Sequence, residues 1–181
     1  LQFKPDSLTR PDQIDLHILT QKVALDQFQV ERLDALTSPL NWATTLGEAM
    51  SGLVLRDYAP VEQRLASFGA RCAATPVFLD QVQALLQPGQ VKPPEVEKMV
   101  TLQRLEGLTA TGGLYDKTLP QLLQSSTLNA KDQASIVASC SAAVAGINDF
   151  ARWVDKTLGP RENGNWRLGR ELYDAKYALQ M

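Results

Sequence analysis

The chain has 181 residues, of which 44% are hydrophobic and 21% charged, and its formal net charge at pH 7 is −2. This composition is that of an ordinary globular domain and excludes collagen-like and strongly disordered chains. The 18 Lys and Arg residues are scattered among 20 Asp and Glu residues, so no basic stripe predicts a nucleic-acid partner. We expect a single helical domain over residues 1–181, burying roughly 70% of the surface that the unfolded chain exposes.

The first predicted helix covers residues 9–36. Asp12 is a plausible N-cap, and Asp15 stands three residues later, in the position of a capping box. The apolar residues of this segment cover more than one helical face, which predicts a helix buried between neighbours. They are Ile14, Ile18, Leu19, Val23, Leu25, Phe28, Val30, Leu33 and Leu36.

Each of the next three predicted helices begins beside a proline. Ser38 precedes Pro39 in the second, Pro60 suits the first turn of the third, and Thr75-Pro76 starts the fourth. Their apolar stripes are Trp42, Leu46, Met50 and Leu53, then Val61, Leu65, Phe68 and Cys72, then Leu79, Val82 and Leu86.

The middle of the chain contains a linker and an ambiguous stretch. Four prolines and glycines in residues 87–96 (QPGQVKPPEV) forbid a continuous helix. A fifth helix is predicted over residues 95–111. Gly112-Gly113 and Pro120 then leave two possibilities open, one kinked helix or two short ones.

A long helix is predicted from Asn129 or Ser126 to about Leu158. The uncharged run within it, residues 134–148, is too short to span a bilayer. Its apolar stripe is Ile136, Cys140, Ala143, Ile147, Phe150, Val154 and Leu158.

The loop over residues 159–166 (GPRENGNW) precedes a closing helix. That helix carries a stripe of Leu168, Leu172, Ala175 and Leu179, with no stop signal before Met181. Because no segment alternates β-branched and polar residues, the sequence predicts an all-α fold: an antiparallel multi-helix bundle of about seven or eight helices, without a sheet.

No catalytic, cofactor-binding or metal-ligating residue is predicted. His17 is the single histidine, so neither a di-iron pair of Glu-x-x-His motifs nor a His-Glu-x-x-His zinc motif exists. A catalytic triad would need the same residue as its base. We interpret His17 as a satisfied or solvent-facing helix residue, and we expect no cofactor in this chain.

Cys72 and Cys140 both lie on apolar stripes. We interpret them first as buried free thiols, which behave as small hydrophobic side chains. The alternative is a mutual disulfide, which requires an oxidising compartment. A reactive nucleophile ranks third.

Other features receive structural interpretations. The Gly pair in TATGGLYDK lacks the spacing of a phosphate-binding loop, so it predicts a helix break. The acidic pairs Asp12/Asp15 and Glu95/Glu97 suit helix starts. The aromatic residues are interpreted as core rather than as a carbohydrate-stacking surface. They are Trp42, Trp153, Trp166, Tyr58, Tyr115, Tyr173 and Tyr177.

Four segments in this order resemble one bacterial family, domain of unknown function 885. They are IDLHILTQKVALDQFQVERL, SPLNWATTLGEAMSGLVLRDYAP, RLASFGARCAATPVFLDQVQALL and WRLGRELYDAKYALQM. The most telling stretches are RDYAP (residues 56–60) and RLGRELY (residues 167–173). The likeness covers nearly the whole chain, but only the N-terminal helical part of family members.

The resemblance implies a parent protein that is a zinc metallopeptidase, with a His-Glu-x-x-x-Gly-His-His-like motif well downstream. Nothing in this chain matches that motif, so no zinc ligand is carried over. We expect that the chain is an N-terminal fragment and that zinc belongs to the missing part. The resemblance also implies an exported, periplasmic or lipoprotein, parent.

Two hypotheses of function follow. In the first, the chain is the non-catalytic part of a metallohydrolase, walling a substrate channel and packing on the downstream catalytic part of the same polypeptide. In the second, it is a self-sufficient helical binding or scaffold module. We also expect that the isolated chain either has frayed order near Met181 or forms a homodimer through the closing helix, since the apolar stripe of this helix would otherwise stay exposed. No transmembrane segment is predicted.

Overall fold

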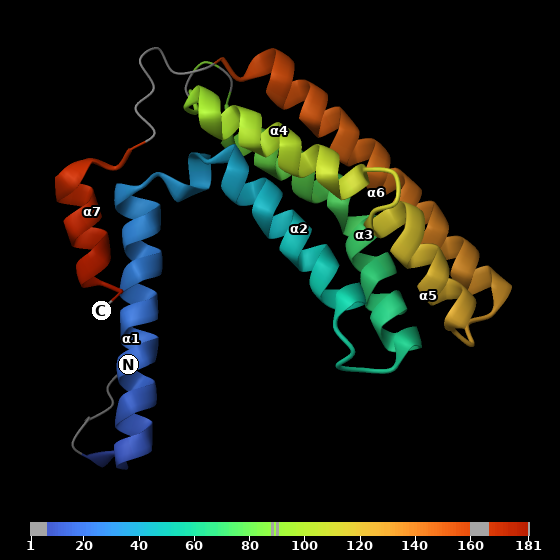
Figure 1. Cartoon of the computed structure of the whole chain (residues 1–181), viewed down its shortest axis with the longest axis horizontal. Helices are drawn as coiled ribbons and strands as arrows, with labels where there is room; N and C mark the ends of the chain where they lie inside the picture. The colour runs from blue at the N-terminus through green and yellow to red at the C-terminus, as the bar shows by residue number, and fades with distance from the viewer. Residues whose placement is uncertain (1–6, 88, 90, 160–166, 181) are drawn as a thin grey trace. The chain divides into compact units, whose positions relative to one another are not determined.

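The computed structural model describes residues 7–87, 89, 91–159 and 167–180, which contain helices and no β-strand. The predicted all-α fold class is therefore confirmed for this part of the chain (Figure 1). The helices are α1 (Arg10–Arg32), α2 (Pro39–Leu55), α3 (Val61–Leu85), α4 (Glu95–Thr109), α5 (Leu119–Ser125), α6 (Ala130–Thr157) and α7 (Gly169–Ala178), with the 3₁₀ turn η2 (Ala35–Thr37) and the π-helical turn η3 (Leu114–Thr118).

The chain divides into two compact units. Unit 1 comprises the described residues of Leu1–Leu36 and Arg167–Met181, and unit 2 comprises those of Thr37–Trp166. The prediction of a single domain over residues 1–181 stays a prediction. The predicted loop GPRENGNW lies outside the described residues, apart from Gly159.

Unit 1 consists mainly of α1 and α7, which lie side by side (Figure 1). The N-cap of α1 is Thr9, not Asp12 as predicted. Thr9 Oγ1 accepts a hydrogen bond from the Asp12 backbone N–H and donates one to the Asp12 carboxylate. The helix therefore begins about one turn earlier than expected, and Asp12 occupies its third position, N3 of the capping motif. Arg32 of α1 pairs with Glu171 of α7 at 3.5 Å.

The predicted burial of α1 is wrong, because none of its residues is buried. Among the described helices of unit 1, α7 is the one that packs against α1, and one short helix cannot cover apolar residues that occupy more than one face of a longer helix. Ile18, for example, keeps 58% of its surface exposed. The other large apolar residues of α1 with high exposure are Ile14, Leu19, Val23 and Val30.

Unit 2 is built around α3 and α6, which make the most extensive helix–helix contact of the described chain. Gly69 permits their close approach, because an added Cβ would lie 2.9 Å from the Ile136 side chain. The predicted stripe of α6 is buried in full, and it packs into one apolar core with residues of α2 and α3. The buried members of that stripe are Ile136, Cys140, Ala143, Ile147, Phe150, Val154 and Leu158.

The prediction that Thr75-Pro76 starts a separate helix is wrong, since α3 runs unbroken through Pro76. Proline inside a helix costs roughly 3 kcal/mol, because it removes one backbone hydrogen bond and crowds the preceding turn. Burying each large apolar side chain contributes roughly 1.5–3 kcal/mol, and several such residues stand on the same face before and after Pro76. They are Leu65, Phe68, Leu79 and Val82.

The turn between α2 and α3 is held by a buried arginine, Arg64 of α3. Its Nε donates to the Ala59 carbonyl at 2.9 Å and its Nη1 to the Arg56 carbonyl at 3.1 Å. Its Nη2 pairs with Asp57 at 2.7 Å, although the Asp57 side chain is 93% exposed. The guanidinium thus binds three groups of the RDYAP stretch, which gives that sequence a structural role.

Several predicted helix starts agree with the structure, whereas α7 ends at Ala178, before the end of the chain to which the prediction extended it. Ser38 and Asn129 cap α2 and α6 by accepting the backbone N–H of Asn41 and Asp132. Helix α4 covers most of the predicted residues 95–111. Of the two possibilities left open around Pro120, the structure shows two short pieces, η3 and α5, after a break at Gly112-Gly113.

By length and composition alone, α6 is the one described helix that could cross a membrane. A core helix of a globular unit meets the same two criteria. Because α6 buries one continuous face in the core of unit 2, we describe it as a core helix.

Candidate functional site

The residues considered for catalysis or metal binding belong to different units of the chain. His17 lies exposed on α1, whereas Cys72 and Cys140 lie in the core of unit 2. No group of three or more His, Cys, Asp and Glu side chains in the described residues could hold a metal ion. The structure therefore offers no cluster of these side chains from which to build a metal centre within the described ranges.

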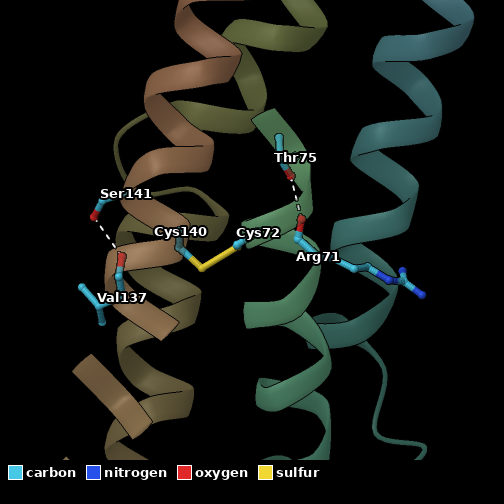
Figure 2. Close-up of a disulfide and its surroundings, with 6 residues drawn as sticks. All are labelled: Arg71, Cys72, Thr75, Val137, Cys140 and Ser141. Carbon is cyan, nitrogen blue, oxygen red and sulfur yellow. Dashed lines mark hydrogen bonds between the residues drawn. A yellow bond between two sulfur atoms is a disulfide. The ribbon is translucent and has the colours of Figure 1, made fainter. Parts of the chain in front are cut away.

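Cys72 and Cys140 form a disulfide between α3 and α6 (Figure 2). Our first interpretation, buried free thiols, is wrong, and the alternative is correct. The two stripes face each other, and at these positions the Cα atoms are 4.9 Å apart, within the range that a disulfide bridges. Each stripe was visible in the sequence, but their mutual register was not, so the pairing could not be inferred.

The disulfide is buried in the core of unit 2. Cys72 is 0% exposed and Cys140 is 3% exposed. The two hydroxyl side chains in Figure 2 donate hydrogen bonds to backbone carbonyls of their own helices. Thr75 donates to the Arg71 carbonyl and Ser141 to the Val137 carbonyl, both at 2.9 Å. This burial is typical of a structural disulfide rather than of a catalytic one.

Beside Cys140 lies a cavity of about 440 Å³, which we call the Tyr115 cavity. Four elements of unit 2 contribute to it: the end of α4, the turn η3, the helix α5 and the middle of α6. Its lining residues are Thr109, Tyr115, Asp116, Leu119, Pro120, Leu123, Val137, Cys140, Ser141 and Val144. Most of these side chains are apolar.

The π-helical turn η3 positions Tyr115 in the wall of this cavity. The Gly113 carbonyl accepts hydrogen bonds from both Lys117 N–H at 2.9 Å and Thr118 N–H at 3.3 Å. Gly113 is needed here because an added Cβ would lie 2.9 Å from the Ala110 carbonyl oxygen. The Gly pair that we interpreted as a helix break therefore also prepares a π-helical turn, a feature found frequently at functional sites.

The Tyr115 phenol is unusual in lacking a hydrogen-bond partner. Its ring packs against Phe68, with ring centroids 5.7 Å apart. Its oxygen is shielded from solvent and is the one such unpaired side-chain atom among the described residues. Burial raises the pKa of Tyr115 to about 12, so the phenol is neutral at physiological pH. An unpaired buried hydroxyl costs about 1–3 kcal/mol.

The other polar groups around the cavity already have partners within the chain. Thr109 Oγ1 lies 3.0 Å from Asn148 Oδ1, and Asp116 Oδ2 accepts the Gly112 N–H at 2.7 Å. Ser141 donates to the Val137 carbonyl. Tyr115 is therefore the lining residue whose side-chain hydrogen bonding the described chain leaves incomplete, and its shielded oxygen does not open onto the cavity.

The predicted aromatic core is only partly observed. Trp42, Trp153 and Tyr115 are half-buried against the core, and Trp166 lies outside the described residues. Three tyrosines predicted as core are exposed instead: Tyr58, Tyr173 and Tyr177. Tyr58 lies in the exposed turn that Arg64 holds, and the latter two stack on each other along α7.

Comparison with known proteins identifies one similarity. The sequence profile of a family described as "Bacterial protein of unknown function (DUF885)" matches residues 1–181. No curated protein and no solved structure matches the chain. The resemblance inferred from the sequence is confirmed at the level of the family, whereas the zinc metallopeptidase activity that it implied stays a prediction.

Proposed function

Because the chain belongs to the DUF885 family of bacterial proteins, we propose that it is the non-catalytic N-terminal helical part of a zinc-dependent metallopeptidase or related hydrolase. In this proposal its helices wall a substrate channel, and they pack on a downstream catalytic part of the same polypeptide. The zinc ligands belong to that downstream part.

The observation that carries the proposal is the exposed apolar surface of unit 1. None of the 23 residues of α1 is buried, although many are large and apolar. Helix α7 adds Tyr173 and Tyr177, which are 59% and 51% exposed. Exposed apolar side chains in this number favour an interaction surface, and the remainder of the polypeptide is the partner that we propose for it.

Hydrogen exchange compared between the parent protein and this chain alone tests the proposal. We expect amides of α1 to exchange at least tenfold more slowly in the parent, where its apolar faces are covered. Amides of α6 serve as the internal control, because α6 is already buried. Equal exchange of α1 in both proteins would contradict the packing that we propose.

Zinc content and peptide hydrolysis, measured on the same two samples, test the catalytic half of the proposal. The parent should retain about one zinc ion after dialysis and should cleave peptides, whereas the chain alone should do neither. A parent without zinc and without hydrolytic activity would overturn the metallopeptidase assignment. The packing of α1 on the downstream part would still be decided by the hydrogen-exchange comparison.

A second function is favoured by the self-contained core of unit 2. Its helices share one buried core and a disulfide, as a self-sufficient binding or scaffold module would require. Under this alternative, α1 exchanges equally in both samples and the parent has no hydrolytic activity.

Without its partner, the isolated chain is proposed to form a homodimer through α7. Leu168, Tyr173 and Tyr177 are exposed along this helix. Sedimentation velocity should show a concentration-dependent dimer that the double variant Tyr173→Ser/Tyr177→Ser abolishes. A monomer at all concentrations would rule this dimer out.

We further propose that the protein folds in an oxidising compartment, such as the periplasm. The support is the buried disulfide, since disulfides persist in such compartments and are rare in the cytosol. Thiol labelling of the denatured protein from bacterial fractions tests this. After denaturation without reductant the protein should show no labelled thiol, and two labelled thiols would contradict the proposal.

A further inference from the structure

We propose that η3 and α5, residues 114–125, form a lid that opens as one unit while the rest of unit 2 stays folded, and that this opening controls the access of thiols to the Cys72–Cys140 disulfide. The lid is hinged at Gly112-Gly113 on one side and at residues 126–128 on the other. It belongs to unit 2 alone, and it is independent of the zinc chemistry and the packing of α1 proposed above.

The lid is attached to the core by few buried side chains. Within residues 114–125 the buried side chains are those of Leu119 and Leu123, whereas α6 buries a continuous stripe. Helix α5 packs mainly on η3 and makes a smaller contact with α3. Because a helix of seven residues is not stable by itself, α5 and η3 should lose their structure together. Segments with few buried apolar contacts are the first to open in a native protein.

The closed lid has two unfavourable features that opening relieves. The cavity of about 440 Å³ is lined by Leu119 and Leu123 of the lid and by Val137 and Val144 of α6, so packing between the lid and α6 is incomplete. In addition, the shielded Tyr115 oxygen has no hydrogen-bond partner. Opening gives this hydroxyl access to water, and an unpaired buried hydroxyl therefore disfavours the closed state.

Both ends of the lid have the features of hinges. Gly112 has a φ of +78°, a conformation that glycine adopts without strain, and a few such residues can absorb the backbone rotation of a moving segment. At the other end, Glu62 of α3 accepts hydrogen bonds from Thr127 N–H and Thr127 Oγ1, both at 2.9 Å. This anchor lies just beyond the lid, so the chain after it stays fixed while the lid moves.

The disulfide lies at the wall that the lid covers. Cys140 lines the same cavity as Leu119 and Leu123 but is only 3% exposed, and Cys72 is 0% exposed. A thiolate must reach a sulfur atom to attack a disulfide, and the closed lid restricts that approach. The disulfide is therefore protected when the lid is closed and reducible when it is open.

Native-state hydrogen exchange of the whole chain at increasing urea concentration tests the lid. Amides of residues 119–125 should exchange at least tenfold faster than those of α6. They should share one urea dependence that is smaller than that of α6, because a partial opening exposes less surface than global unfolding. Exchange at the rate and urea dependence of α6 would overturn the lid, as would unrelated urea dependences along the segment.

The variant Tyr115→Phe tests the cost of the closed state. It keeps the ring that packs on Phe68 and removes the unpaired hydroxyl, so the lid amides should exchange about fivefold more slowly or slower still. Tyr58→Phe is the matched control and should change nothing, because Tyr58 is exposed in the α2–α3 turn. Unchanged or faster exchange of the lid in Tyr115→Phe would overturn the role of this hydroxyl.

Reduction by dithiothreitol under native conditions tests the link between the lid and the disulfide. One reagent thiolate breaks the S–S bond and forms a mixed disulfide. The second reagent thiol then displaces the protein sulfur, so two electrons pass to the protein, which gains two thiols, and the reagent becomes a cyclic disulfide. The rate at which protein thiols appear should fall in Tyr115→Phe by the same factor as the exchange of the lid. An unchanged rate would overturn the gating.

The variant Val154→Ala separates lid opening from global unfolding. Val154 is 0% exposed in α6 and lines no part of the cavity, so its truncation should speed the exchange of α6 at least fivefold by weakening the core. Exchange of the lid and reduction of the disulfide should keep their wild-type rates. Reduction that accelerates in parallel with α6 would show that thiols reach the disulfide through global unfolding, which would overturn the proposal.

Discussion

Helices α1 and α6 are both long, with 23 and 28 residues, yet they differ in burial. Helix α6 buries a continuous stripe, whereas α1 buries no residue within the described chain. In α6 the large apolar residues recur on one face, with many alanines and serines between them. In α1 they are spread around the helix. One neighbouring helix can cover a stripe, but it cannot cover several faces at once.

The comparison shows that the arrangement of apolar residues, rather than their number, decides whether a helix belongs to a core. Helix α6 also has a covalent link to its neighbour through the Cys72–Cys140 disulfide. Helix α1 instead has exposed ion pairs such as Lys22–Asp26, which contribute little to stability. We therefore expect unit 2 to carry most of the measurable stability.

The largest effect should come from removing the disulfide. The double variant Cys72→Ala/Cys140→Ala loses a cross-link between residues 68 positions apart, which contributes roughly 4 kcal/mol in the chain-entropy account. Urea unfolding followed by tryptophan fluorescence reports on unit 2, which contains Trp42 and Trp153. Reductant should destabilise the wild-type protein and leave the variant unchanged. An unaltered urea midpoint in the variant would contradict this prediction.

A matched pair of isoleucines tests the comparison directly. Ile147 of α6 is 0% exposed, whereas Ile18 of α1 is 58% exposed. Ile147→Ala should lower the free energy of unfolding by about 2–5 kcal/mol, because it leaves a cavity in the core. Ile18→Ala should change it by less than about 0.5 kcal/mol. Comparable losses in both variants would mean that α1 is buried in solution.

The next effect concerns Arg64, whose guanidinium binds the α2–α3 turn. Arg64→Met keeps much of the side-chain volume but leaves the Arg56 and Ala59 carbonyls without their donor. We expect a loss of about 2 kcal/mol. Arg104→Met on the exposed surface of α4 is the control and should be nearly neutral. Chemical denaturation of both variants provides the measurement, and equal midpoints would refute a role for this buried cluster.

The smallest effect should be a pH dependence from Glu62 of α3. Its carboxylate accepts hydrogen bonds from Thr127 N–H and Thr127 Oγ1, both at 2.9 Å. These bonds lower the pKa of Glu62 below the ordinary value of 4.5. A lowered pKa means that the stabilisation is present above about pH 4.5 and is lost as pH falls through the folded-state pKa.

Thermal unfolding between pH 6 and pH 3 measures this contribution. The variant Glu62→Gln should lose less stability on acidification than the wild-type protein, and the difference should vanish at the acidic end. Parallel profiles for the two proteins would show that Thr127 does not stabilise the carboxylate.

The sequence predicted the helices of unit 2 well because local signals agreed there. The stripe of α6, its cap at Asn129 and the proline-rich linker before α4 each depend on nearby residues. The prediction split α3 into two helices because Thr75-Pro76 resembles a helix start, although the apolar stripe of α3 continues past this point. That stripe continues in register from Leu65 to Leu86, and the burial of those side chains outweighs one lost backbone hydrogen bond.

The candidate site was largely beyond prediction from the sequence. The Tyr115 cavity needs four elements in a particular arrangement, and the unpaired oxygen of Tyr115 reflects side chains distant in the chain, such as Phe68. The cysteines were recognised on their stripes, but their pairing depends on the register between α3 and α6. The Gly112-Gly113 break was visible, whereas the π-helical turn that follows it was not.

The disulfide also determines how the protein responds to a protease. Cys72 and Cys140 close a covalent ring that includes α4, η3 and α5. A single cut inside that ring, for example at the exposed Thr111-Gly112 segment, leaves both pieces joined by the sulfur bridge. Such nicked protein would migrate as one band without reductant and as two bands with it. A cut near Asp34, outside the ring, would instead release α1 from unit 2 as a separate peptide under either condition.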